Sequence, residues 1–172
     1  MKKKKINLAL IILLLLGVLI LLANLPYKPK GFVENMTFEK HSDLFFNYEI
    51  IRYPSSVEVS PVRPDQERLK LGVVVDPWNL NFGIVPIGNN FVTRFIEISN
   101  PKEKSAKIVF KVYGNISPFV NFTRNDFIIK PNESVTIEAK FYAEKAKIGN
   151  YTGEIDIVIQ RPKYEFLYNF WK

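Results

Sequence analysis

Apolar and polar residues alternate with a period of two along most of the chain after residue 69. Five runs carry apolar side chains at every second position and are separated by turn residues: 80–84, 92–98, 108–112, 135–141 and 155–159. Arg94 is the exception on the apolar face of its run. Such alternation predicts strands with one buried and one solvated face. Short apolar segments at 119–122 and 127–129 extend the pattern, so the chain predicts an all-β antiparallel sandwich of roughly seven to eight strands.

The N-terminal segment is apolar on every face. From Leu8 to Ala23 there are 16 consecutive apolar or glycine residues. A helix of about 20 residues spans the ~30 Å hydrocarbon core of a bilayer. Residues 6–25 therefore predict a single transmembrane helix in contact with lipid, ended by Pro26. The four lysines at positions 2–5 predict a cytoplasmic N-terminus, which makes the chain a single-pass protein of the cell membrane with an extracytoplasmic C-terminal domain.

A cleaved signal peptide is the alternative interpretation of this segment. Its apolar region is typically about 7–15 residues long and ends in a small-x-small cleavage site. Here the apolar run is longer, and the best candidate site begins with the bulky Leu21. These two features favour a retained anchor, and a buried core helix is disfavoured because no face of the segment is polar.

Residues 26–68 contain repeated proline breaks and are expected to form a stalk with one or two short strands. The aromatic and β-branched stretch 44–53 is the best candidate for such a strand. The predicted organisation is therefore a cytoplasmic tail and transmembrane helix at 1–25, a stalk at 26–68 and a β-sandwich domain at 69–172.

The net charge of +7 does not indicate nucleic-acid binding. Four of the 24 basic residues are Lys2 to Lys5, and the remaining 20 face 17 acidic residues. No later block of five like charges occurs. We therefore expect no nucleic-acid partner.

Catalytic and metal-binding patterns are missing from the sequence. The chain has no cysteine and one histidine, His41, which by itself forms neither a catalytic triad nor a zinc site. Glu154 and Asp156 lie two positions apart on one predicted strand and are expected on its wet face. No phosphate-binding loop or nucleophile motif occurs. We expect no enzyme activity, no cofactor and no bound metal.

Five Asn-x-Ser/Thr sequons are candidate glycosylation sites. Three of them, Asn115, Asn132 and Asn150, fall in predicted turns, where a glycan would not disturb the core. The alternative is that Asn and Thr are simply favourable in turns and at strand edges. In a host that glycosylates, we expect some of the five to be modified: Asn35, Asn115, Asn121, Asn132 and Asn150.

The C-terminal residues alternate as in an extended strand that has aromatic side chains on one face. One interpretation is an eighth core strand or a strand that pairs with residues 44–53. The other is an exposed strand that binds a partner by edge addition or lies at the membrane interface. In the second case the candidate partner-binding residues are Tyr164, Phe166, Tyr168, Phe170 and Trp171.

Four blocks in order carry a resemblance to a known group of domains. They are VVVDPWNLNFGIVPIG at 73–88, IEISNP at 96–101, IKPNESVTIEAKF at 129–141 and GNYTGEIDIVI at 149–159. Residues 73–162 thereby resemble the immunoglobulin-like domains of the ASH (Hydin-type) and major-sperm-protein group. The resemblance implies a seven-stranded immunoglobulin-like sandwich used for protein contact or scaffolding, without catalysis.

Two functional hypotheses remain open. The first is a non-enzymatic, membrane-anchored module that binds another membrane or cell-surface protein through a sheet edge or its aromatic tail. The second is an assembly factor or chaperone that adds a strand to a surface or filament subunit, which usually requires a second domain. A carbohydrate-binding module is disfavoured because Trp78 and Trp171 are the only tryptophans.

Overall fold

The structure, a computed structural model, describes residues 14, 15, 17, 31–61 and 78–168. The chain divides into two compact units, Met1–Gly31 and Phe32–Lys172. Of the expected transmembrane segment, only Leu14, Leu15 and Gly17 lie within the described residues, and they are helical. In the described part of the chain, no helix has the length and apolar character needed to cross a membrane.

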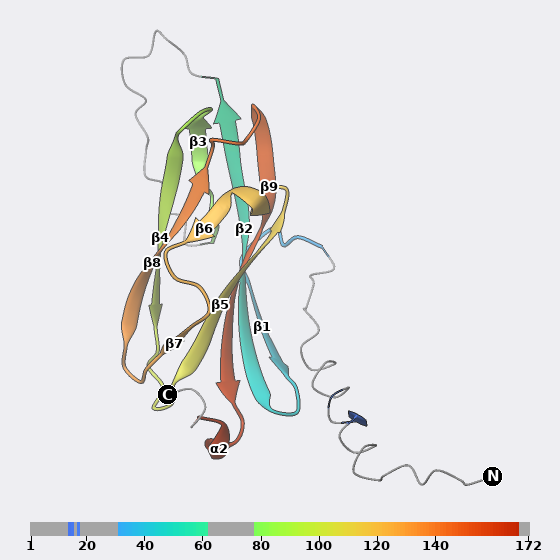
Figure 1. The fold of residues 1–172 in the computed structure, drawn as a ribbon, viewed down its shortest axis with the longest axis vertical. Coiled ribbons are helices and arrows are strands. Elements are labelled where there is room, and N and C mark those ends of the chain that lie inside the picture. Colours follow the sequence, from blue (N-terminus) through green and yellow to red (C-terminus); the bar gives the residue numbers. More distant parts are fainter. Residues whose placement is uncertain (1–13, 16, 18–30, 62–77, 169–172) are drawn as a thin grey trace, which may run out of the picture. The chain divides into compact units, whose positions relative to one another are not determined.

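The regular structure described in the second unit consists mainly of β-strands (Figure 1). In chain order its elements are β1 (Thr37–Ser42), β2 (Phe46–Ser60), β3 (Gly83–Pro86), β4 (Phe91–Ser99), β5 (Ala106–Gly114), η1 (Ser117–Phe119), β6 (Val120–Phe122), β7 (Phe127–Ile129), β8 (Ser134–Tyr142), β9 (Gly149–Pro162) and α2 (Glu165–Tyr168). The all-β prediction is confirmed. The described residues form nine strands, which exceeds the expected number because the predicted stalk contributes β1 and all of the long strand β2.

Two sheets share one hydrophobic core. Sheet A has the order β1-β2-β9-β5-β7, and β3 lies beside the second half of β2. Sheet B has the order β4-β8-β6. The strand pairs of the described residues are antiparallel except β2–β3, which is parallel. Sequence alternation places apolar side chains of both sheets between them, and Phe141 of sheet B is fully buried 6.1 Å from the ring of Phe82.

The expected domain boundary at residue 69 is corrected by strand β2. Residues 46–59 pair along their full length with β9, and Val57 and Val59 are buried in the core. Pro54 does not break the strand, because its carbonyl oxygen accepts a hydrogen bond from the Leu80 N–H, 3.1 Å away. The nitrogen and oxygen of one strand residue point the same way, so the missing N–H of Pro54 faces away from β9. Residues 32–61 therefore belong to the sandwich and not to a stalk.

Asp43 closes the hairpin between β1 and β2. Its carboxylate accepts hydrogen bonds from the N–H groups of Phe45 and Phe46, at 2.8 and 2.7 Å, and from the Tyr48 hydroxyl at 2.7 Å. Burial acts to raise the pKa of Asp43, but these hydrogen bonds and the ammonium group of Lys163 outweigh it and hold the pKa below its ordinary value. The ionised side chain thus replaces missing backbone partners in the turn.

Gly153 allows β5 and β9 to approach closely at the end of their ladder, where it lies opposite Gly114. A Cβ atom at Gly153 would collide with the carbonyl oxygen of Tyr113 and would lie 2.7 Å from Cγ2 of Ile116. Ile116 is fully buried, so neither neighbour can move without disturbing the core.

Gly153→Ala is expected to lower the free energy of unfolding by about 1–3 kcal/mol or more, because overpacking against backbone is poorly relieved. Chemical denaturation of the full-length protein measures the effect. Gly31→Ala is the matched control, since an added Cβ there meets nothing within 4 Å. Equal stability of the two variants would contradict the close approach.

Candidate functional site

The free edge of β4 is the first candidate site. Sheet B pairs β4 with β8 on one side, and in the described residues no strand pairs with its other side. Two backbone hydrogen bonds show which residues of β4 point toward β8. The Ala143 N–H donates to the Asn90 carbonyl oxygen and the Asn100 N–H to that of Glu133, both at 2.9 Å. Because alternate residues in an antiparallel ladder point opposite ways, five residues direct their backbone groups toward the free edge: Phe91, Thr93, Phe95, Glu97 and Ser99.

Exposed aromatic side chains lie beside this edge. Phe95 is 68% exposed and Phe91 57%, and the Phe91 ring lies 5.9 Å from that of Tyr142 on β8. Lys140 lies 5.8 Å above the Phe91 ring and pairs with Glu138 at 2.6 Å. We call Phe91, Phe95 and Tyr142 together with the free backbone of β4 the β4 edge patch. Natural edges are usually short, charged or interrupted by proline, whereas this nine-residue strand carries two exposed phenylalanines.

Arg94 was the charged exception on the apolar face of its run, and the structure gives it a specific contact. Its Nε donates a hydrogen bond to the carbonyl oxygen of Asn81, in the segment that leads into β3. The side chain therefore bridges the two sheets at this side of the sandwich. This contact ties β4 to the segment before β3 and does not use the outward backbone groups of β4.

Glu154 and Asp156 form a buried acidic pair, which corrects the expectation of a wet strand face. Both residues have no exposed surface, and the Val33 N–H donates to Glu154 Oε2 at 3.0 Å from the segment before β1. Burial, together with a hydrogen bond to Glu154 and its charge, raises the pKa of Asp156 to about 7. The charges of Arg52 and Lys111 act in the opposite direction.

Arg52 supplies the opposite charge on the outer face of sheet A. Its guanidinium lies 3.9 Å from Asp156 and 3.3 Å from Glu39 of β1, and the side chain is almost fully buried. The register pairs Arg52 directly with Asp156 across the β2–β9 ladder. Paired carboxylates that share a proton also occur in active sites, but this pair has no exposed surface for a substrate to reach. The arrangement can hold and release a proton, and thereby couples stability to pH.

Asp156→Asn is expected to stabilise the protein by roughly 1–4 kcal/mol at pH 8 and to flatten its pH dependence. Between about pH 4 and 7 the folded chain retains a proton that the unfolded chain releases. The stability contributed by protonated Asp156 is therefore present at low pH and is lost as the pH rises through about 7. Chemical denaturation at a series of pH values measures both effects.

Asp126→Asn is the control for this variant, because Asp126 is exposed and paired with Lys107 at 2.6 Å. It is expected to change stability by less than about 0.5 kcal/mol. An unchanged pH slope in Asp156→Asn would show that Asp156 is ionised throughout the range.

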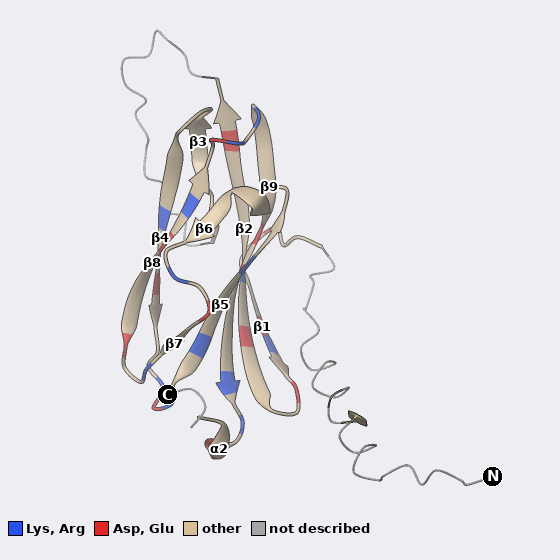
Figure 2. Ribbon diagram, viewed as in Figure 1, with Lys and Arg blue, Asp and Glu red and all other residues tan. Residues whose placement is uncertain are grey.

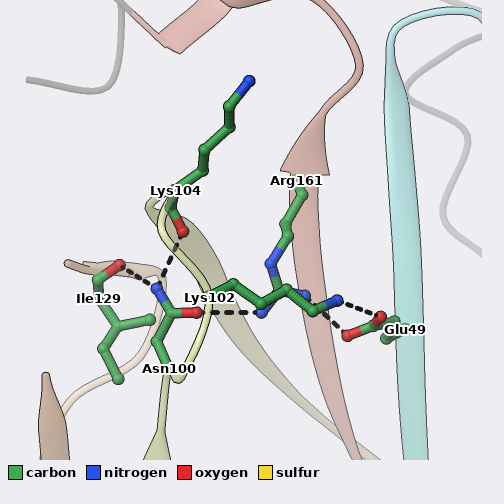
Figure 3. A network of polar contacts seen from close by, with 6 residues as sticks. All are labelled: Glu49, Asn100, Lys102, Lys104, Ile129 and Arg161. Atoms are coloured by element: carbon green, nitrogen blue, oxygen red, sulfur yellow. Dashed lines mark hydrogen bonds and ion pairs between the residues drawn. The ribbon is translucent and has the colours of Figure 1, made fainter. Parts of the chain in front are cut away.

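Asn100, which follows the last residue of β4, is the centre of a polar network that the alternation of the sequence did not indicate. It is almost fully buried, and its Nδ2 donates to the carbonyl oxygens of Lys104, Lys130 and Ile129 at 3.0, 3.1 and 3.4 Å. Its Oδ1 accepts a hydrogen bond from Arg161 at 3.2 Å (Figure 3). Asn100 thus ties the loop after β4 to the end of β7 and to β9.

Residues 165–168 of the predicted C-terminal strand form the single helical turn α2 instead, so the described aromatic residues there do not share one strand face. Tyr164 and Phe166 are exposed and stack at 5.8 Å, whereas the Tyr168 hydroxyl donates to the Pro162 carbonyl oxygen at 3.1 Å. Phe170 and Trp171 lie outside the described residues.

All five sequon asparagines are exposed, but they do not share one setting. Asn115 and Asn132 lie in turns, Asn35 lies in the bend before β1, and Asn121 and Asn150 lie in strands. The Oδ1 of Asn115 accepts a hydrogen bond from the Thr152 N–H at 2.6 Å, whereas a glycan attaches to Nδ2. Asn121 also lines a hollow of about 430 Å³ with Tyr142 of the β4 edge patch. A glycan at Asn121 would therefore occupy one end of that patch.

Among the described residues, no group of three or more His, Asp or Glu side chains is arranged to hold a metal ion. No known protein family, curated protein or solved structure matches the chain.

Proposed function

We propose that the chain is a non-enzymatic, membrane-anchored interaction module of the cell surface. Its sandwich binds an extended segment of another membrane or cell-surface protein along the free edge of β4. The observation that carries the proposal is the edge of β4 that no described strand pairs with, beside the exposed rings of Phe91 and Phe95. Both backbone pairing and apolar contact are available there at one place.

Strand addition explains why the two features occur together. A docked strand satisfies the outward N–H and C=O groups of β4, while its own side chains cover the neighbouring aromatic rings. Burial of apolar surface contributes roughly 25 cal/mol per Å², so two phenylalanine rings add substantially to the backbone hydrogen bonds. Aromatic side chains are also enriched at the centres of protein interfaces.

The resemblance to the ASH and major-sperm-protein group also supports this proposal. That group implies an immunoglobulin-like sandwich that makes protein contacts without catalysis. The block 96–101 that carries part of the resemblance contains Asn100, whose hydrogen bonds tie the loop after β4 to β7 and β9. The proposal includes the predicted anchor at residues 6–25, with the sandwich on the extracytoplasmic side.

A photoreactive residue at Glu97 is expected to crosslink to a protein partner in native membranes, because Glu97 is exposed and its backbone faces the free edge. Thr93→Pro in the same chain is expected to abolish the crosslink. It removes an outward N–H group but leaves the β4–β8 ladder complete. Crosslinked products are identified by mass spectrometry.

Two controls make this experiment specific. Thr93→Val keeps the N–H group and is expected to retain the crosslink. A photoreactive residue at the exposed Lys145, in the loop before β9, is expected to give none. A crosslink that survives Thr93→Pro, or equal crosslinking from position 145, would contradict strand addition at β4. A chaperone role would instead give crosslinks to newly made, unassembled subunits alone.

The anchor predicts that the full-length protein stays in the membrane pellet after carbonate extraction, because a transmembrane helix is held by its apolar surface and not by charge. Mass spectrometry of the native N-terminus is the companion measurement. Release by carbonate, or a mature chain that begins near Asn24, would replace the anchor with a cleaved signal peptide.

A further inference from the structure

A polar hollow of about 450 Å³ lies at the end of sheet A where the β1–β2 hairpin meets the end of β9. Because side chains alternate along a strand, Asn47 and Glu49 lie on the same face of β2 as the core residue Val57. Arg161 of β9 lies opposite Asn47 in the register. Lys40 of β1 lies opposite Glu49 in the register. The core-side face of the sheet thus becomes polar at this end and lines a hollow instead of the core.

Positive charge exceeds negative charge in this hollow. Lys40, Lys102 and Arg161 line it, and Glu49 is the one carboxylate among its lining residues. Glu49 accepts hydrogen bonds from Lys102 at 2.8 Å and from Arg161 at 2.7 Å (Figure 3). Partial burial opposes ionisation, but these two cations outweigh it and hold the pKa of Glu49 below its ordinary value. One carboxylate therefore balances only one of the three cations, and Figure 2 shows basic residues on β1 and at the end of β9.

Arg161 is fixed in orientation and retains unused donors. Its side chain is 13% exposed and is held between Glu49 and the Asn100 Oδ1 atom. A guanidinium has five N–H donors, and these two hydrogen bonds use two of them. Lys102 is 52% exposed, and Lys40 is also exposed, so both ammonium groups can move onto a bound group. A fixed guanidinium beside mobile ammonium groups is the donor set that suits carboxylates and phosphates.

We propose that this hollow binds a small polar molecule that carries a carboxylate or a phosphate group. The anionic group contacts Arg161, Lys102 and Lys40, and neutral hydroxyl groups of the ligand meet Asn47 and Ser42. The volume lies within the range of small-molecule sites, about 300–1,000 Å³, and fits a single sugar unit. The hollow lies at the opposite end of β9 from the loop that contains Lys145. No residue of β4 lines it, so the ligand would use none of the outward backbone groups of β4.

Isothermal titration calorimetry on the full-length protein in a non-ionic detergent tests the proposal at low ionic strength. The probes are glucuronate, glucose 6-phosphate and glucose. At least one of the two anions is expected to bind with a Kd of about 1 mM or lower, and glucose is expected not to bind. Binding of glucuronate alone identifies a carboxylate ligand, and binding of glucose 6-phosphate alone identifies a phosphate ligand. Failure of both anions, or equal binding of glucose, overturns the proposal.

Charge-removing variants separate the hollow from general electrostatic attraction. Lys40→Gln and Lys102→Gln are each expected to weaken anion binding at least about fivefold, because each removes one cation from the hollow. Lys145→Gln removes the same charge at the other end of β9 and is expected to leave the Kd unchanged. An equal loss of affinity in Lys145→Gln and Lys40→Gln would assign the binding to net charge and overturn the site.

Discussion

The antiparallel ladder between β2 and β9 is the constraint on which the rest of the structure depends. It joins 14 residues of each strand, and β1, β3 and β5 all pair with one of these two strands. The same register sets Arg52 opposite Asp156 on one face and Asn47 opposite Arg161 on the other. A slip of one residue would exchange the faces of a strand and turn the charge of Arg52 or Asp156 toward the core. The register of β2 and β9 therefore determines the fold, the buried acidic pair and the polar hollow together.

Sequence alternation predicted much of the fold because most strands bury one face only. The runs at 92–98, 108–112 and 135–141 correspond to β4, β5 and β8. Strand β2 was missed as a core element because Pro54 and Pro61 were interpreted as breakers. A proline interrupts a ladder only on the side that its nitrogen faces, and this direction depends on tertiary pairing.

The candidate sites were less predictable, because they depend on what covers each surface. Phe91 and Phe95 give β4 apolar residues on both faces, which the sequence contains as a signal, but the unpaired edge follows only from strand order. Glu154 and Asp156 do share one strand face, as expected. Their burial arises from residues far away in the chain, such as Val33 and Arg52. At the C-terminus, the period-two pattern was outweighed by a local helical turn at 165–168.

Residues that pair between β2 and β9 are between 90 and 116 positions apart in the chain. Such a high contact order slows folding, since the entropy of closing a long loop is lost before the strands gain their contacts. Strand β2 leaves the ribosome early and can pair with β1 and β3, but β9, with which it pairs over 14 residues, is made after all the other described strands. The sandwich therefore cannot fold progressively from its N-terminus. A chain that ends before residue 149 would lose a central strand of its larger sheet and would leave the buried face of β2 open to aggregation.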